Sequence, residues 1–319
     1  DPRARGRAEY RLGMSHAPSI HLALGAFDGV HLGHRAVLHS ARAAARHAHG
    51  SVGVMTYEPH PSKVLRPESA VPLILNRTQK DERLTEAGAE FIHHQEFTLQ
   101  HAAMEAADFP AWLQHHFKGL RSVHVGANFR YGQGRTGDGE SLVRDAGKLG
   151  LAVHLVEPVA LDGEAVSSSR VRAALRHGDL ALANRMLLRP YEATGTIIDG
   201  RRLGRTIGFP TLNLPWNPEL RPAFGVYAVE LVNADGLAEP AVANWGLRPT
   251  VESGPVEPLL ETHILRASGP IPTTGAAVRI RWLHFLRHEQ KFANLAALQA
   301  QIASDAQAAS VIHGLAGGR

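Results

Sequence analysis

Two histidines stand three residues apart in the segment LGAFDGVHLGHRAVL, a spacing that could aim both imidazoles at one anion. The glycines Gly25, Gly29 and Gly33 would let the backbone approach a phosphate chain closely. A helix is expected to begin near Gly33, and its first turn would offer unpaired amide donors. We therefore predict that His31 and His34 bind a polyphosphate. A zinc pair or an ordinary turn with two chance histidines is the alternative.

A second candidate anion site lies in VSSSRVRAAL, where three serines precede a helical pattern that carries Arg170 and Arg172. One serine would be explained by N-capping, but three serines followed by arginines favour a phosphate site. Between the two segments, VGANFRYGQGRTGD forms a glycine-rich loop. Its Phe129 and Tyr131 are suited to covering a flat ring, although surface glycine loops are common.

A third candidate site is the stretch TGTIIDGRRLGRTIGFPTLNLPW, which matches neither the P-loop nor the protein-kinase pattern. Thr211 and Asn213 alternate on an expected strand, so their side chains share a face and their oxygens suit a hard cation. A glycine-rich barrel turn is the alternative. Downstream, the residues alone favour an ordinary edge-strand glutamate at Glu261, beside His263.

The chain shows two different sequence patterns, and the folds that they predict would position these residues. From Ile20 to Leu187, apolar runs alternate with helical patterns, which predicts a parallel sheet flanked by helices. After Arg189-Pro190, short strands separated by Gly, Pro and Asn predict a small antiparallel barrel or sandwich. We predict domains over residues 18–187 and 188–319.

A final helix is predicted from four apolar residues that would form one face. They are Phe292, Leu295, Leu298 and Ile302.

Composition narrows the class of protein. The 44% apolar content can build cores, and a net charge of +4 is too small to require a nucleic-acid partner. The absence of cysteine excludes disulfides, thiolate nucleophiles and cysteine-based metal sites. The 20 histidines form no HExxH array, so most are expected to be solvated or packed. There is no run of 18 uncharged apolar residues and no signal-peptide pattern at the start, so we expect a cytoplasmic enzyme with a loose lead-in over residues 1–18.

The motifs GAFDGVHLGH, TYEPHP, VGANFRYGQGRTGD and VSSSRVR resemble the adenylyltransferase half of the bacterial bifunctional riboflavin kinase/FMN adenylyltransferase (FAD synthetase) family. The resemblance implies a Rossmann-like nucleotidyltransferase domain in which His31 and His34 are catalytic. The ATP-binding residues it implies are Gly25, Phe27, Asp28, His31, Gly33, His34, Asn128, Ser168, Ser169 and Arg172. The flavin-binding residues it implies are Pro59, His60, Pro61 and Phe129.

The motifs GFPTLN, FGVYAVEL, NWGLRPTV, LETHIL and the closing LHFLRHEQKFANLAALQAQIASDAQAA resemble the riboflavin kinase half of the same family. The resemblance implies an antiparallel β-barrel with a terminal helix, a catalytic proton acceptor at Glu261, and Mg²⁺ ligands at Thr211 and Asn213. The ATP-binding residues it implies are Gly200, Gly204, Gly208, Pro210, Thr211 and Asn213. Arg287 and Phe292 would border the flavin.

The resemblance implies two reactions: ATP phosphorylates riboflavin to FMN, and a second ATP adenylylates FMN to FAD with release of pyrophosphate. The expected partners are riboflavin, FMN and ATP with Mg²⁺, without nucleic acid or membrane; the sequence neither predicts nor excludes an oligomer. The family pattern is altered at Glu58, Asn128, Ser169, Leu212 and in RASGPIPTTG (266–275). Two alternatives stay open: a flavin-binding regulator without turnover, and an enzyme with only one active half.

Overall fold

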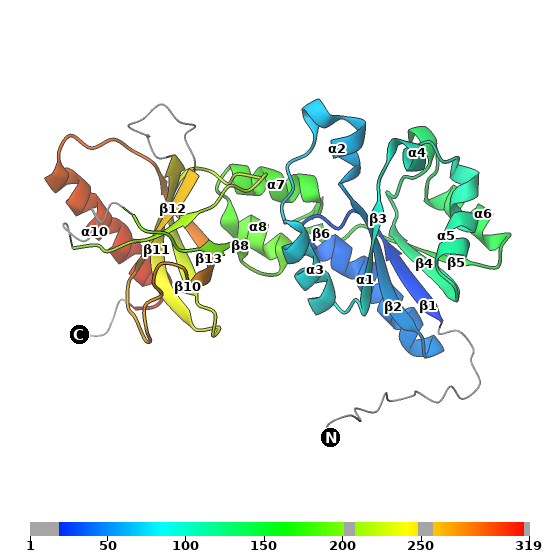
Figure 1. Cartoon of the computed structure of the whole chain (residues 1–319), viewed down its shortest axis with the longest axis horizontal. Coiled ribbons are helices and arrows are strands. Elements are labelled where there is room, and N and C mark those ends of the chain that lie inside the picture. Colours follow the sequence, from blue (N-terminus) through cyan, green and yellow to red (C-terminus); the bar gives the residue numbers. More distant parts are fainter. Residues whose placement is uncertain (1–18, 201–207, 248–257, 316–319) are drawn as a thin grey trace, which may run out of the picture. The chain divides into compact units, whose positions relative to one another are not determined.

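The computed structural model describes residues 19–200, 208–247 and 258–315. Its contacts divide the chain into two compact units (Figure 1). The first, here called the α/β unit, comprises Asp1–Phe27, Gly33–Val71 and Thr78–Val159. The second, here called the barrel unit, comprises Asp28–Leu32, Pro72–Arg77 and Ala160–Arg319. The expectation for residues 1–18 lies outside the described residues.

The α/β unit is built on a five-stranded parallel sheet with the strand order β3-β2-β1-β4-β5. This is the order of a doubly wound nucleotide-binding sheet, so the predicted Rossmann-like fold is confirmed. The strands are β1 (Ile20–Leu24), β2 (Ser51–Glu58), β3 (Phe91–Glu96), β4 (Leu120–Gly126) and β5 (Ala152–Val156).

Helices cover both faces of this sheet. Val123 and Val125 of β4 face one side, where they join a buried core with Leu113 and Leu142. His124 points to the other side and contacts Ser40 of the helix that follows β1. The helices of this unit are α1 (Leu32–Ala48), α2 (Pro61–Leu65), α3 (Arg77–Glu86), α4 (Leu99–Ala102), α5 (Phe109–His116) and α6 (Gly139–Gly147).

The barrel unit contains a six-stranded sheet in the order β8-β13-β10-β11-β12-β9, whose neighbours are all antiparallel. The Ile198 N–H donates to the Asn213 carbonyl at 2.9 Å and links the end of β8 to β9, which nearly closes the sheet. The predicted barrel is therefore confirmed. The strands are β8 (Tyr191–Thr196), β9 (Leu212–Pro215), β10 (Gly225–Val232), β11 (Ala238–Leu247), β12 (Pro258–Ile264) and β13 (Ala277–His288).

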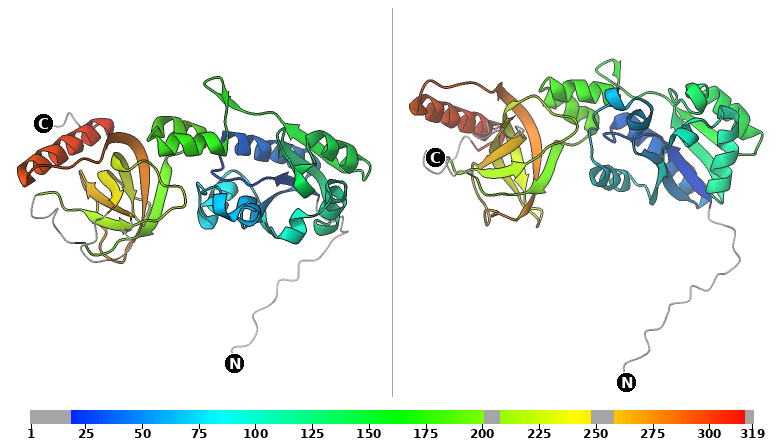
Figure 2. Two further views of the ribbon diagram at one scale, coloured as in Figure 1. Left: turned by 90° about the horizontal axis from the view of Figure 1, so that it is seen from above. Right: turned by 45° about the horizontal axis from the view of Figure 1, so that its top comes forward.

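The inside and the outside of the barrel have different partners. Its interior is filled by large rings, including Tyr191, Tyr227, Trp245 and Trp282, which are all fully buried. Its outer face is covered by α10 (Leu295–Ile312), which lies along one side of the barrel in Figure 2.

The apolar face predicted for this terminal helix is partly wrong. Asn294 caps the helix by accepting the Ala297 N–H, so Phe292 precedes the helix, and Leu295 in the first turn is 58% exposed. The face that meets the sheet includes Leu298 and Ile302 as predicted, and it continues to Asp305 and Ala309.

Two helices that come between the two sheets in the sequence belong to the barrel unit. They are α7 (Ser168–Arg176) and α8 (Leu180–Leu187). They follow a short hairpin, β6 (Ala160–Leu161) and β7 (Glu164–Ala165). Asn184 of α8 donates to the Trp282 carbonyl at 2.8 Å and accepts the Tyr191 N–H at 2.8 Å. The domain boundary between residues 187 and 188 stays a prediction.

Candidate active sites

A pocket of about 400 Å³ lies between the outer face of the barrel and α10. Its apolar wall includes Val226, Val242, Phe292, Leu298 and Ile302. Its polar lining comprises Thr211, Asn244, Glu261, His263, Arg287, Glu289, Gln290 and Asp305. A pocket of this size, apolar with a few polar groups, is typical of a small-molecule site.

Strand register aligns the polar side chains of this pocket in one row. Asn213 pairs with Glu261, Glu261 with Asn244, Asn244 with Val226, and Val226 with Arg287. Paired residues share a sheet face, and neighbouring strands are about 4.8 Å apart, so Glu261 and Arg287 are separated by about 14 Å. The pocket can therefore take an elongated ligand with one polar group at each end.

The segment before β9 is tightly fitted around Asn213. Asn213 is buried, and a Cβ atom at Gly200 would collide with its amide group, so a larger residue at position 200 would force the Asn213 side chain to move. Gly208 has a φ of 86°, a left-handed conformation that favours glycine. The His263 Nδ1 lies 2.8 Å from the Pro210 carbonyl oxygen, which fixes this segment beside β12. Gly204 lies outside the described residues.

A buried ion pair stands at the other end of the pocket. The Arg287 Nε and Nη2 atoms donate to the Asp305 carboxylate at 2.9 and 2.7 Å, and Gln301 donates to it at 2.9 Å. The Arg287 Cζ also lies 5.8 Å from the centre of the Phe292 ring. The sequence predictions missed Asp305, although an acidic residue seven positions after Leu298 on an apolar helix face was a usable signal.

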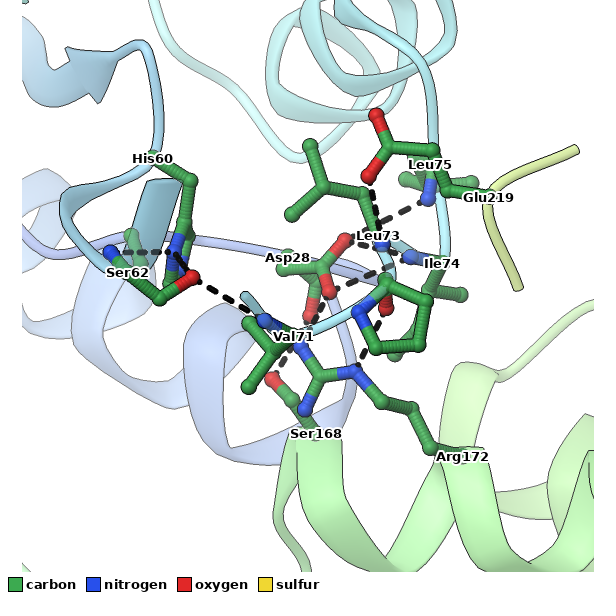
Figure 3. Close-up of polar contacts among 12 residues, drawn as sticks. Asp28, His60, Ser62, Val71, Leu73, Ile74, Leu75, Ser168, Arg172 and Glu219 are labelled. Carbon is green, nitrogen blue, oxygen red and sulfur yellow. Dashed lines mark hydrogen bonds and ion pairs between the residues drawn. The ribbon is translucent and has the colours of Figure 1, made fainter. Parts of the chain in front are cut away.

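The histidine motif begins in the barrel unit at a buried carboxylate, that of Asp28. It accepts the Ile74 N–H at 2.9 Å and the Leu75 N–H at 3.3 Å, and it pairs with the Arg172 Nη2 at 2.5 Å (Figure 3). The Arg172 Nε donates to the Pro72 carbonyl at 2.9 Å. Burial raises the pKa of Asp28 above its ordinary value, against the opposing charge of Arg172. Both side chains therefore bind protein groups of the same unit.

The three serines at the start of α7 have three different environments. Ser167 is the N-cap and accepts the Arg170 N–H at 3.2 Å. The Ser168 hydroxyl donates to the Asp28 carbonyl at 2.8 Å, as Figure 3 shows. Ser169 is exposed in the first turn of the helix. The helix start and the Ser169 hydroxyl thus remain suited to an anion.

His31, which follows the Asp28 loop, is buried with 5% of its surface exposed. Burial, together with the charges of Arg172 and Arg189, lowers its pKa to about 4. The imidazole is therefore neutral at pH 7, and it can act as a hydrogen-bond donor without carrying a charge.

The other half of the motif lies in the α/β unit. Helix α1 begins at Leu32, within one residue of the predicted start, and places Gly33 and His34 in its first turn. Phe27 is buried, and its ring meets the His34 ring edge-on at 5.2 Å. The Gly25 N–H donates to the Met55 carbonyl at 3.2 Å, directly after β1.

The TYEPHP element runs from the end of β2 into α2. Pro59 follows a cis peptide bond, and His60 caps α2, where Pro61 is the first residue. The His60 Nδ1 accepts the Ser62 N–H at 3.2 Å, and the Ser62 hydroxyl accepts the Val71 N–H at 3.1 Å (Figure 3). His60 therefore orders the chain between β2 and residue 71.

In the glycine-rich loop after β4, the structure contradicts the expectation that Tyr131 covers a ligand ring. Asn128 is exposed, and the Phe129 ring stacks on Tyr131 with ring centres 5.7 Å apart. Tyr131 is only 5% exposed and packs on Phe109 in the core, so it cannot cover a ligand ring as expected. Gly137 makes room for it, because a Cβ atom there would meet the Tyr131 ring.

Comparisons with known proteins identify the family of this chain. The family model described as FAD synthetase matches residues 14–170, and the one described as riboflavin kinase matches residues 187–313. The bifunctional riboflavin kinase/FMN adenylyltransferase of Escherichia coli (strain K12) is 35% identical over 294 residues, which cover 92% of this chain and 93% of the relative. The chain belongs to the bifunctional riboflavin kinase/FMN adenylyltransferase family.

A second relative carries the same family name, and a solved structure with a different description shares the fold. The family member of Bacillus subtilis (strain 168) is 35% identical, with 90% of each chain covered. A solved structure from Streptococcus pneumoniae, described as a macrolide-efflux protein, has a TM-score of 0.82 at 27% identity and covers 93% of this chain and 95% of its own. Among the described residues, no helix has the length and apolar character needed to cross a membrane.

Membership in this family gives the chain two activities. As a riboflavin kinase it converts riboflavin to FMN, and as an FMN adenylyltransferase it converts FMN to FAD. ATP and the flavins are the substrates of these activities.

Proposed function

We propose that the pocket under α10 holds riboflavin, with the ring system at the Arg287 end and the ribityl chain reaching Glu261. The observation that carries this proposal is the strand-register row, which separates Arg287 and Glu261 by about 14 Å on one sheet face. The apolar wall and the Phe292 ring suit the flat flavin ring, and the Arg287 guanidinium suits its polar edge.

In the kinase reaction, Glu261 accepts the proton of the riboflavin 5′-hydroxyl as that oxygen attacks the γ-phosphorus of ATP. The new O5′–P bond forms while the bond from the γ-phosphorus to its bridging oxygen breaks, and ADP leaves. The carboxylate stands on β12 in the wall of the pocket, where the bound hydroxyl would arrive.

Thr211 and Asn213 would hold Mg²⁺ together with the ATP phosphates. Their neutral oxygens fit this ion, because Mg²⁺ keeps several waters and takes much of its coordination from substrate phosphate. When bound, the ion would neutralise phosphate charge. Gly200, Gly204, Gly208 and Pro210 would surround the nucleotide.

In the adenylyltransferase reaction, an FMN phosphate oxygen attacks the α-phosphorus of ATP, and pyrophosphate leaves. Neutral His31 donates a hydrogen bond to the phosphates, with His34 in the same role, and the start of α7 with Ser169 and Arg172 adds further donors. Ser168 would border the phosphates while its hydroxyl stays on the Asp28 carbonyl. Asp28 stabilises this set through its pair with Arg172. Gly25, Phe27, Gly33 and Asn128 complete the proposed ATP site, and Pro59, His60, Pro61 and Phe129 the proposed flavin site.

We further propose that the protein works in the cytoplasm, where ATP is available, with small molecules alone as partners. The boundary at 187/188 is kept as the proposed division between the two activities.

Replacement of Thr211 tests the metal-nucleotide assignment. Thr211→Val deletes a hydroxyl at nearly constant shape, so we expect a higher Mg²⁺ requirement and a higher KM for ATP in FMN formation. FAD formation from supplied FMN should not change. Thr274→Val, which removes an exposed hydroxyl outside the pocket, is the matched control. Unaltered Mg²⁺ and ATP dependence in Thr211→Val would refute the assignment.

A further inference from the structure

The loop that precedes His31 has an unfavourable backbone conformation. Gly29 has a φ of 91° and Val30 a φ of 43°. Glycine adopts positive φ readily, but a β-branched residue such as valine rarely does. Such conformations persist only where the surrounding structure imposes them, and they cluster at functional sites. The contacts that impose the positive φ angles of Gly29 and Val30 therefore indicate which residues support the loop.

Two side chains of the same unit bind consecutive carbonyls of the loop. The Ser168 hydroxyl donates to the Asp28 carbonyl at 2.8 Å, and the Arg189 Nη2 donates to the Gly29 carbonyl at 2.9 Å. Ser168 belongs to the serine motif. Arg189 belongs to no motif of the adenylyltransferase half, and it lies between α8 and β8.

The second bond of Arg189 fixes its position. Its Nη1 donates to the Leu187 carbonyl at 3.1 Å, near the end of α8. The planar guanidinium thus bridges two carbonyls that are far apart in sequence, Leu187 and Gly29. The Ile74 side chain also limits the loop, because a Cβ atom at Gly29 would lie only 3.0 Å from it.

We propose that Arg189 is a positioning residue for FAD formation, which acts by holding the Gly29 carbonyl and with it the strained peptide that leads to His31. Arg189 lies within the residues matched by the riboflavin kinase model, 187–313, whereas Gly29 and His31 lie within those matched by the FAD synthetase model, 14–170. A residue of the kinase segment therefore supports the other reaction. The inference rests on the proposed role of His31.

The test compares Arg189→Ala and Arg189→Lys in the full chain. A misplaced catalytic group can cost about 10²-fold in rate, so we expect kcat for FAD formation from FMN and ATP to fall by about that factor in Arg189→Ala. KM for FMN and ATP should change much less. Arg189→Lys keeps the positive charge but loses the two-pronged hydrogen bonding of the guanidinium. Its kcat should therefore lie between those of wild type and Arg189→Ala. Arg185→Ala is the matched control, because Arg185 is an exposed arginine of α8 whose guanidinium pairs with Asp162.

Two further measurements separate positioning from stability. Riboflavin phosphorylation and the thermal unfolding temperature should be unchanged in Arg189→Lys, and added guanidinium ion at low concentration should partly restore FAD formation in Arg189→Ala. A normal kcat in both variants would overturn the proposal. So would a loss of FAD formation that follows the loss of folded protein in both variants. His31→Ala is assayed in parallel, and a normal rate there would refute the role of His31 separately from that of Arg189.

Discussion

The kinase pocket and the histidine loop reach defined geometry by different means. Glu261 and Asn244 of the pocket stand on neighbouring strands of one sheet, where register alone makes Glu261 a neighbour of both Asn244 and Asn213. The loop at Asp28–Leu32 has no such ladder, and hydrogen bonds from remote segments fix it. A site on a sheet needs few supporting side chains, whereas a site on a loop depends on residues that perform no chemistry.

The largest effect that would separate the two sites is expected for His31→Ala. Loss of one preorganised donor to a transition state commonly costs about 10²- to 10³-fold in kcat, so FAD formation should fall by that factor. FMN formation should persist. His39→Ala, on the exposed side of α1, is the control. Wild-type FAD output from His31→Ala would remove His31 from the mechanism.

The converse change is Glu261→Gln in the pocket. It keeps size and hydrogen bonding but removes the proton acceptor, so FMN formation should fall by about 10²-fold. FAD formation from supplied FMN should match wild type, as measured by chromatographic separation of the flavins. Equal losses of both products would contradict the separation of the two sites.

A smaller effect is expected at the far end of the pocket. Asp305→Asn removes the charge that pairs with Arg287, so the guanidinium loses its fixed orientation beside the bound flavin. We expect KM for riboflavin to rise about tenfold, which is about 1.4 kcal/mol, with kcat much less affected. Asp235→Asn, in an exposed turn of the same unit, is the control. An unchanged KM would show that Arg287 needs no partner.

The α/β unit should also lose stability in acid because of a buried histidine chain. His124 lies 2.8 Å from both Ser122 and Ser40, and its ring stacks on His154. Burial, followed by the charges of His154 and His21, lowers the pKa of His124 from 6.5 to about 3.

The sign of this effect follows from proton uptake. The unfolded chain binds a proton at His124 below pH 6.5 and the folded chain does not, so the free energy of unfolding decreases as the pH falls between the two pKa values. His124→Gln should reduce that slope by about 1.4 kcal/mol per pH unit. Denaturant unfolding at several pH values measures it, and an equal slope in the variant would contradict the prediction.

The smallest effect is expected where α8 ends. Leu188 has a φ of 57° and a ψ of 25°, and its side chain is 57% exposed. Leu188→Gly should raise the free energy of unfolding by about 1 kcal/mol, because glycine removes the left-handed penalty and little packing is lost. Leu188→Ala keeps the penalty and serves as the control. A Leu188→Gly variant less stable than Leu188→Ala would contradict this account.

How far the sequence predicts the structure depends on the range of the contacts involved. Apolar runs that alternate with helical patterns predict the first sheet, and short strands separated by Gly, Pro and Asn predict the second, because both patterns are local. The strand Phe91–Glu96 was not identified, since FIHHQE has little apolar content and forms a half-buried edge strand. Tyr131 was assigned to a ligand because ring type alone does not distinguish a surface ring from a core ring.

The same limit applies to the candidate sites. Thr211 and Glu261 both line the pocket under α10. The alternation of Thr211 with Asn213 is a local signal, whereas the role expected for Glu261 depends on the family resemblance. The anchors of Asp28 at Ile74 and Leu75 are backbone amides, which carry no side-chain signal in a sequence. Arg189 is separated from its partner Gly29 by 160 residues, so no local pattern could connect the two.

Asn213 combines two duties that limit how its position can vary. Its backbone carbonyl accepts the Ile198 N–H that joins β8 to β9, while its side-chain amide fills the space left by Gly200. A larger side chain at either position would disturb the seam of the barrel as well as the proposed nucleotide site. The tolerance of residue 213 to change is therefore tied to that of residue 200.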